Sequence, residues 1–137
     1  MRRVYIDGIF DLFHRGHLES LKKAKEKDTY LIVGVISDEI AKDYKRIPII
    51  SHEDRIEIIK NLSIVDEVIE NPPLVITEEF VKINNIDLVV HGFSNEDDWE
   101  KQKDFFEFLT KNNKFKRISY YDKTSTTDII SRIKTDY

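Results

Sequence analysis

The stretch from residue 4 to residue 17 constrains the fold of this chain most strongly. Val4 to Ile6 have the apolar character of a short buried strand, Gly8 interrupts that pattern, and a helical pattern begins near His17. A strand, a tight loop and a helix N-terminus therefore follow one another directly. This order is typical of open α/β sheets, which bind their ligands at the carboxyl ends of the strands.

Two histidines at the junction of this loop and helix indicate a phosphate site. The free N–H groups at a helix start carry partial positive charge, and His14 and His17 are spaced to lie on one side of the first turn. Gly16 lets a bulky anion approach the backbone. A single histidine near a strand end is more often an ordinary hydrogen-bonded residue, so the prediction depends on the pair. We expect this loop to bind a polyphosphate.

The composition excludes several classes of function. The chain has 137 residues, the size of one domain, and it has no cysteine, which excludes disulfides, thiolate zinc sites and a cysteine nucleophile. The 22 Lys+Arg against 26 Asp+Glu give a net charge of -4, which argues against a general nucleic-acid-binding protein. No signal-peptide pattern precedes the first strand, and no apolar run approaches the roughly 18 residues of a transmembrane segment. We therefore expect a cytoplasmic protein.

The pattern of apolar residues predicts alternating strands and helices. We expect strands at residues 4–6, 30–36, 66–69, 87–91 and 115–120. We expect helices at 17–27 and 97–112, and after the N-cap residues Ser37, Ser51, Thr77 and Ser125. The helix at 97–112 is expected to be anchored by Trp99, Phe105, Phe106 and Leu109, and the terminal helix by Ile129, Ile130 and Ile133. The order predicts one doubly wound, Rossmann-like α/β domain over 1–137, with about five parallel strands.

The first loop resembles the signature of the cytidylyltransferases, the nucleotidyltransferases that make CDP-alcohols. Asp7-Gly8 and Phe10-Asp11 precede the His-Arg-Gly-His sequence at 14–17. The segment 64–69, Ile-Val-Asp-Glu-Val-Ile, is similar to the family's Tyr/Trp-Val-Asp-Glu-Val, and His91-Gly92 stands where the family has a histidine in the nucleotide pocket. The resemblance extends over nearly the whole chain and implies a transferase of phospholipid synthesis that forms a homodimer.

The resemblance also implies the catalytic residues, which are His14, His17, Lys45 and Arg55. Alone, Lys45 in the loop at 43–50 and Arg55 in the next helix would indicate a solvated basic surface. They fall, however, where the family has a lysine and an arginine. Arg46 stands where the family usually has glycine. An ammonium in this loop can bridge two phosphates that repel each other.

The last motif matches the family only in part. Ser125, Thr126 and Thr127 resemble the end of Arg-Thr-Glu-Gly-Ile-Ser-Thr-Thr, but Tyr120 replaces the arginine and Lys123 the glycine. A plain N-cap would also explain Ser125. Lys123 or Arg117 is a candidate to replace the lost guanidinium. The nucleotide-binding residues that the resemblance implies are Gly8, Ile9, Phe10, His14, His17, His91, Gly92, Tyr120, Ser125, Thr126 and Thr127.

The implied reaction transfers CMP from CTP to a phospho-alcohol and releases pyrophosphate. Mg²⁺ is expected to accompany CTP on phosphate oxygens and water, since the motif offers no dedicated carboxylate cage. The implied substrate-binding residues are Asp7, Lys45 and Leu74. Asp7 suits an ammonium alcohol. Because Leu74 stands where the choline branch has tryptophan, phosphoethanolamine is favoured over phosphocholine, unless Phe93 or Tyr5 supplies an aromatic face.

Two alternatives stay open. Glycerol 3-phosphate is a third candidate substrate, although it offers no cation to Asp7. A different class of function is a nucleotide-binding pseudoenzyme that regulates a partner, which would explain the missing arginine and glycine of the last motif. The presence of His14, His17 and Lys45 favours an enzyme.

Overall fold

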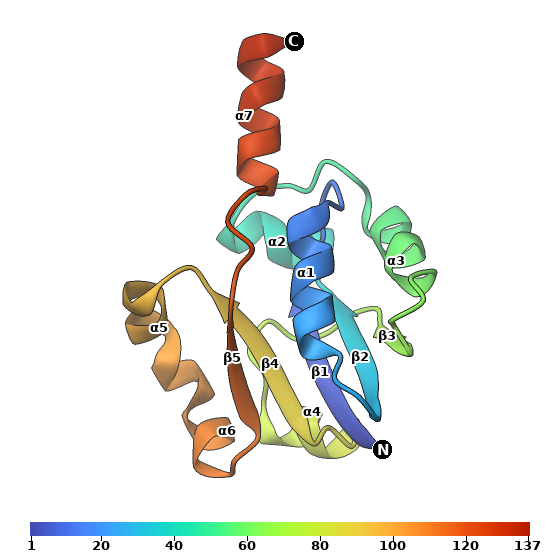
Figure 1. Ribbon diagram of the computed structural model, residues 1–137, viewed down its shortest axis with the longest axis vertical. Coiled ribbons are helices and arrows are strands. Elements are labelled where there is room, and N and C mark those ends of the chain that lie inside the picture. The colour runs from blue at the N-terminus through green and yellow to red at the C-terminus, as the bar shows by residue number, and fades with distance from the viewer.

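Five parallel strands form the centre of the structure, a computed structural model that describes residues 1–137 (Figure 1). They are β1 (Arg2–Gly8), β2 (Thr29–Val35), β3 (Glu67–Ile69), β4 (Leu88–Phe93) and β5 (Phe115–Ser119), in the sheet order β3-β2-β1-β4-β5. This order confirms the predicted doubly wound sheet. The chain reverses its direction across the sheet between β1 and β4, and such a reversal opens a crevice at the carboxyl ends of the two strands.

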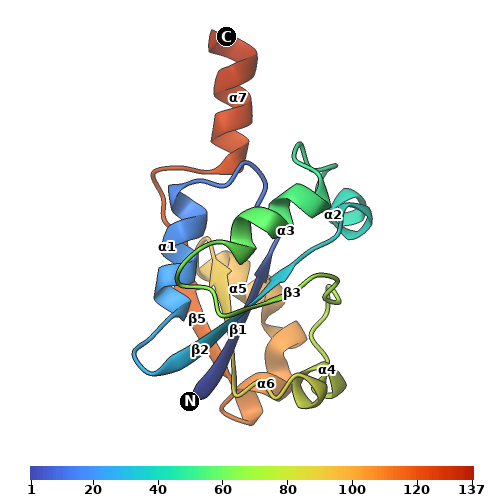
Figure 2. The ribbon, with the colours of Figure 1, turned by 90° about the vertical axis from the view of Figure 1, so that its right-hand side faces the viewer.

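Helices cover both faces of the sheet (Figures 1 and 2). They are α1 (Arg15–Ala24), α2 (Asp38–Tyr44), α3 (His52–Lys60), α4 (Glu78–Ile83), α5 (Glu96–Gln102), the 3-10 turn η1 (Lys103–Phe106), α6 (Glu107–Lys111) and α7 (Thr126–Asp136). The expected N-caps are confirmed, because each side chain accepts a hydrogen bond from an N–H in the following turn, at Ser37, Ser51, Thr77 and Ser125. None of the helices combines the length and apolar character that a membrane-spanning segment needs.

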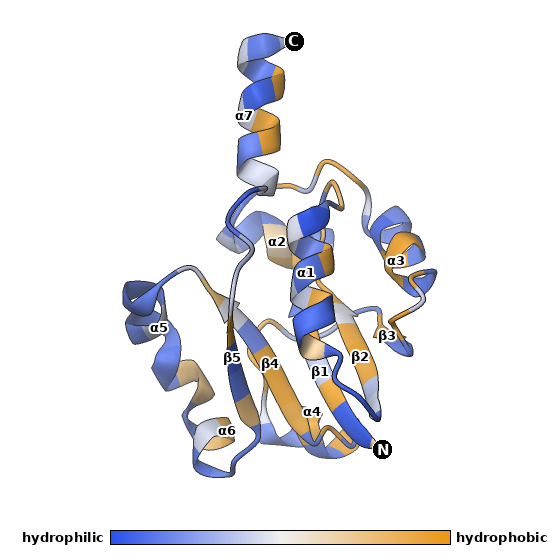
Figure 3. Ribbon diagram, in the orientation of Figure 1, coloured by the Kyte–Doolittle hydropathy of each residue, from blue (hydrophilic) through white to orange (hydrophobic).

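Two apolar clusters hold these layers together, one on each face. Leu21 of α1 and Ile59 of α3 pack with Leu31 and Val33 of β2 on the first face. The second cluster lies under α4 and the segment from α5 to α6, and it includes Tyr5, Ile32, Val81, Val89, Phe93, Phe106 and Leu109. Figure 3 shows long apolar stretches in β2 and β4 and mostly polar residues in α5. Successive strand residues alternate between the two clusters, as expected of a sheet covered on both sides.

The segment predicted as one helix at 97–112 is divided into α5, η1 and α6. A 3-10 turn has three residues per turn instead of 3.6, so it changes which side chains face the sheet. Phe106 and Leu109 are buried as expected, but Phe105 is 62% exposed. The expectation that Phe105 anchors this segment was therefore wrong.

The terminal helix α7 projects away from the sheet (Figures 1 and 2) and has no buried residue. Its expected anchors do not reach the core, and Ile133 is 53% exposed. The periodicity of Ile129, Ile130 and Ile133 correctly indicated a helix, but it carried no information about where that helix points. The start of α7 is connected to the rest of the fold by hydrogen bonds of Thr126 and Thr127.

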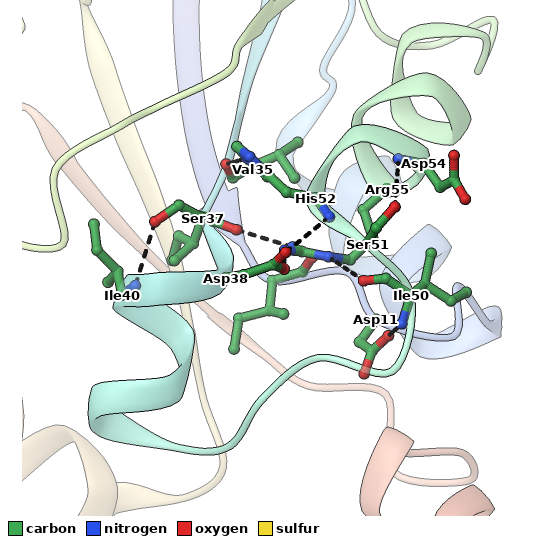
Figure 4. A network of polar contacts seen from close by, with 12 residues as sticks. Asp11, Val35, Ser37, Asp38, Ile40, Ile50, Ser51, His52, Asp54 and Arg55 are labelled. Carbon is green, nitrogen blue, oxygen red and sulfur yellow. Dashed lines mark hydrogen bonds and ion pairs between the residues drawn. The ribbon is translucent and has the colours of Figure 1, made fainter.

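A buried arginine joins the carboxyl ends of β1 and β2 to the loop before α3 (Figure 4). Arg55 has no exposed surface. Its guanidinium donates to the carbonyls of Ile9 at 2.6 Å, Ile36 at 2.9 Å and Ile50 at 2.9 Å, and to Oδ1 of Asp38 at 2.6 Å. One side chain therefore fixes three separate backbone segments.

We expect Arg55→Met to lower the free energy of unfolding by at least about 3 kcal/mol, because it leaves buried carbonyls and a carboxylate without donors. Denaturant unfolding measures the effect. Arg132→Met is the control, since the Arg132 side chain is 71% exposed and its exposed pair with Asp136 is expected to contribute less than about 1 kcal/mol. Equal unfolding midpoints for the two variants would contradict the role given to Arg55.

Candidate active site

A cavity of about 820 Å³ opens at the carboxyl ends of β1 and β4. Its walls come from the β1–α1 loop, the loop after α2, the end of β4 and the segment that leads into α7. Every site residue predicted from the sequence lines this cavity except Arg55. Arg55 lies beneath it, where its donors are occupied by the four acceptors described above.

The β1–α1 loop is held in an unfavourable backbone conformation. Phe10 and Leu12 have φ angles of 55° and 49°, in the left-handed region that residues other than glycine rarely adopt. Such conformations cost on the order of 1–3 kcal/mol each and persist where the surroundings enforce them. Phe10 is buried, and its ring packs closely over Gly8 and edge-on against His17. This packing enforces the strained backbone and keeps the loop beside the two histidines.

The two histidines are stacked, with ring centroids 3.9 Å apart. Nδ1 of His14 accepts from the N–H of Gly16 at 3.0 Å, and Nδ1 of His17 accepts from the N–H of His14 at 3.2 Å. This reciprocal arrangement caps α1. Because both Nδ1 atoms accept from the backbone, each neutral ring carries its proton on Nε2.

Both rings are neutral at pH 7. Burial lowers the pKa of His14. Burial, and then the neighbouring His14 and Lys45, lower the pKa of His17 to about 3, although Asp11 opposes this shift. The pair therefore presents fixed N–H donors, without the repulsion of two adjacent imidazolium ions.

The start of α7 lies against this histidine pair. Nε2 of His14 is 3.1 Å from Oγ1 of Thr126, and that hydroxyl donates to the carbonyl of Asp11 at 3.1 Å. A Cβ on Gly16 would lie 2.8 Å from the carbonyl oxygen of Thr124, so glycine is needed for this approach. The free N–H groups of two helix starts, α1 and α7, consequently lie at one cavity.

Two cations occupy the loop after α2. Lys45 and Arg46 line the cavity, and neither forms an ion pair. Partial burial of the ammonium, and then the charge of Arg46, lower the pKa of Lys45. The carboxylate of Asp11 holds the far end of the loop by accepting from the N–H groups of Ile49 at 2.8 Å and Ile50 at 2.9 Å. An anion between the two cations and the helix starts would relieve their repulsion.

A buried carboxylate lies on the β1 side of the cavity. The side chain of Asp7 is 7% exposed, and burial raises its pKa to about 7. Its Oδ1 is 3.8 Å from Nδ1 of His91, whose own pKa is lowered by burial, so His91 is not a cation there at neutral pH. Asp7 therefore lacks a positive partner. A ligand with an ammonium group would supply one.

Several residues of the site were not identified from the sequence. Asp11 was noted only as part of the motif, and its contact with the lysine loop depends on residues far along the chain. Tyr44 and Phe105 also line the cavity. Aromatic residues at these positions resemble core positions in sequence, so no signal distinguished them. Phe93 and Tyr5 are instead buried in the core and do not line the cavity.

The acidic and histidine side chains are not gathered into a metal centre. No group of three or more His, Asp or Glu side chains is placed to hold a metal ion. The acidic residues that line the cavity are dispersed around it, at Asp7, Asp11, Asp122 and Asp128.

Comparison with curated proteins identifies relatives over almost the whole chain. The chain is 41% identical over 138 residues to choline-phosphate cytidylyltransferase 2 of Arabidopsis thaliana, which covers 98% of this chain and 45% of that protein. It is 38% identical over 140 residues to choline-phosphate cytidylyltransferase A of Homo sapiens, covering 98% and 37%. It is 36% identical over 131 residues to ethanolamine-phosphate cytidylyltransferase of Dictyostelium discoideum, covering 96% and 36%. The chain spans less than half the length of these relatives.

Solved structures share the fold. The lipopolysaccharide core biosynthesis protein from Thermoplasma volcanium GSS1 superposes with a TM-score of 0.71 at 30% identity, covering 89% of this chain and 99% of that one. Pantoate-beta-alanine ligase from Francisella tularensis, at 16% identity and a TM-score of 0.57, covers 97% and 69% and is similar in fold alone. The family model described as cytidylyltransferase-like matches residues 5–132. This chain therefore belongs to the cytidylyltransferase-like family.

Proposed function

We propose that residues 1–137 are the catalytic domain of an enzyme that transfers CMP from CTP to a phospho-alcohol. The observation that carries the proposal is the single cavity that combines the neutral His14–His17 pair, the start of α7 and Lys45. An oxygen of the phosphomonoester attacks the α-phosphorus of CTP. The bond from that phosphorus to the bridging oxygen breaks, pyrophosphate leaves with the electron pair, and a CDP-alcohol forms.

Positioning and charge stabilisation supply the catalysis, because no covalent intermediate is required. His17 donates its Nε2–H to triphosphate oxygens on which charge accumulates, and His14 does the same once a phosphate oxygen takes the place of the Thr126 hydroxyl at its Nε2. Lys45 contacts the incoming phosphate and the α-phosphate together, which offsets the repulsion between two anions. Arg55 acts from below by holding the loops at the ends of β1 and β2, and not by contact with phosphate. Mg²⁺ would be held by the phosphate oxygens of CTP and by water, and would offset the charge on those oxygens.

Asp7 selects the alcohol in this proposal. A buried carboxylate without a positive partner favours a phospho-alcohol that carries an ammonium group over a neutral polyol such as glycerol 3-phosphate. Phosphoethanolamine is the first candidate, because Leu74 at the cavity wall replaces the tryptophan of the choline branch. A primary ammonium can donate three hydrogen bonds to Asp7 and nearby carbonyls.

Phosphocholine is the second candidate, and a specific observation favours it. Tyr44 and Tyr120 line the cavity and are about half exposed. Asp7 lines the same cavity, and its charge adds to the effect of burial, which raises the pKa of both tyrosines. Aromatic faces beside a carboxylate can bind a quaternary ammonium.

A homodimer, a cytoplasmic location and a role in phospholipid synthesis belong to the same proposal, since the resemblance implies them. The alternative of a regulatory pseudoenzyme is separated by one experiment. Pyrophosphate release from CTP is measured with phosphoethanolamine, phosphocholine and glycerol 3-phosphate in turn. Release that depends on one of these alcohols supports the enzyme. Nucleotide binding without release in any mixture would favour the pseudoenzyme.

We expect His14→Ala or His17→Ala to lower turnover by at least about a hundredfold, because the loss of one such donor typically costs about 2.7–4 kcal/mol in the transition state. Pyrophosphate release measures turnover, and thermal unfolding checks the fold, since His14 also caps α1. His52→Ala is the matched control. His52 lies on α3 outside the cavity, and we expect turnover within about threefold of wild type. Wild-type turnover in the double variant of His14 and His17 would refute the assignment.

The pKa of Asp7 predicts a pH dependence for the alcohol site. Below pH 7 this carboxyl is protonated and loses its attraction for a cation. Above pH 7 it is ionised. We therefore expect kcat/KM for phosphocholine, divided by that for glycerol 3-phosphate, to rise up to about tenfold from pH 6 to pH 8. The ratio cancels the titration of the phosphate. In Asp7→Asn the ratio should be flat, and a flat ratio in the wild type would contradict the role of Asp7.

The competition between the two ammonium alcohols is tested by their kcat/KM values on one preparation. We expect phosphoethanolamine to be used at least as efficiently as phosphocholine. Leu74→Trp should then move the ratio toward phosphocholine by up to roughly thirtyfold, the equivalent of a cation–π contribution of about 2 kcal/mol. A strong wild-type preference for phosphocholine that is lost in Tyr44→Leu would instead establish the second candidate.

A further inference from the structure

Tyr120 stands where the family's last motif has an arginine, and neither of the two candidates named from the sequence, Arg117 and Lys123, replaces that arginine at the cavity. Arg117 lies on β5, where its guanidinium is 4.5 Å from the ring centroid of Trp99 and donates to Oε2 of Glu96 at 3.1 Å. Lys123 does not line the cavity, and neither does Arg117. Tyr120, at the position of the family's arginine, carries no positive charge. The cavity must obtain a second cation for a triphosphate from another element.

Arg46 is in position to supply it. Lys45 and Arg46 are the only lysine or arginine side chains that line the cavity. Nη1 of Arg46 is 3.4 Å from Oγ1 of Thr127, at the start of α7. This contact is long for an N–H···O hydrogen bond, and the other four N–H donors of the guanidinium have no partner. A phosphate can therefore bind to Arg46 without breaking a strong interaction.

Hydrogen bonds hold the backbone of the loop that carries Arg46 at both ends. The N–H groups of Lys45 and Arg46 both donate to the carbonyl of Ala41 at the end of α2, at 2.9 Å and 3.0 Å. The other end of the loop is tied to Asp11 through Ile49 and Ile50. The loop thus carries Arg46 toward α7, while Asp11 connects the same loop to the histidine pair through Thr126.

The charge balance of the cavity makes this second cation important. The walls carry four carboxylic acids and only two permanently basic side chains, while both histidines are neutral. Partial burial also lowers the pKa of the Lys45 ammonium. A guanidinium keeps its charge under these conditions and matches phosphate oxygens with paired donors.

We propose that Arg46 binds the β- and γ-phosphates of CTP at the start of α7 and so takes over the function of the arginine that Tyr120 replaces. This inference rests on the proposed function, because it concerns the nucleotide of that reaction. Lys45 remains the residue that bridges the two reacting phosphates. Arg46 holds the part of the nucleotide that leaves as pyrophosphate.

Calorimetric titration of CTP and of CMP into the whole chain tests the proposal without requiring turnover. We expect Arg46→Gln to weaken CTP binding by about tenfold or more, the size of a lost charge-assisted hydrogen bond, and to change CMP binding by less than about twofold. Arg46→Lys should lie between wild type and Arg46→Gln, since an ammonium keeps the charge but not the paired donors.

Arg117→Gln is the matched control, because it removes an arginine that does not line the cavity, and we expect it to bind CTP as the wild type does. Unchanged CTP affinity in Arg46→Gln would overturn the inference. An equal loss of CTP and CMP affinity would overturn it as well, since CMP lacks the two outer phosphates. A wild-type chain that binds CTP no better than ATP or UTP would count against the proposed function itself, which separates that failure from the failure of Arg46.

Discussion

The buried guanidinium of Arg55 is the interaction on which the geometry of the site depends. Its donors join the β1–α1 loop, the end of β2 and the loop that leads into α3, through the carbonyls of Ile9, Ile36 and Ile50. A charge without exposed surface is unfavourable unless it is paired and fully hydrogen-bonded, and Asp38 with these carbonyls meets that requirement. The three carbonyls all accept from Arg55 only when their segments lie around it together. The carboxyl edge of the sheet is therefore held in one arrangement.

Above this network, the site stores strain and unpaired charge in a small volume. Phe10 and Leu12 hold left-handed backbone conformations, Asp7 is buried without a cation, and Lys45 and Arg46 have no anionic partner. Each of these features is unfavourable by itself. In the proposed function the charges are the part that a ligand would compensate, with a phosphate chain at the basic loop and an ammonium at Asp7, whereas the backbone strain is held by packing. The two apolar clusters and the contacts of Arg55 stabilise the fold and so offset the unfavourable free energy of these features.

Local patterns predicted most of the elements correctly and failed where the answer depended on distant contacts. The N-caps at Ser37, Ser51, Thr77 and Ser125 are confirmed, because a cap is a contact between residues within one turn. The strands are found with no end displaced by more than two residues. The helix expected at 97–112 is broken because η1 changes its pitch, and Phe105 consequently faces the cavity and not the core. Arg55 was grouped with the catalytic residues because the family has an arginine at that place, whereas in the structure it is buried and its donors are taken by three carbonyls and Asp38.

The sequence by itself determined the alternation of strands and helices, the loop with its two histidines, and the family, because these are recorded in residue spacing over short stretches. The tertiary structure decided which distant residues meet at the cavity. Only the folded chain brings Thr126 to His14, ties Asp11 to the lysine loop, and leaves Arg46 facing α7 while Arg117 is paired elsewhere. The physical reason is that burial and the choice of hydrogen-bond partner are properties of the packed chain. The neutral histidines and the raised pKa of Asp7 exist only after the sheet has closed around them.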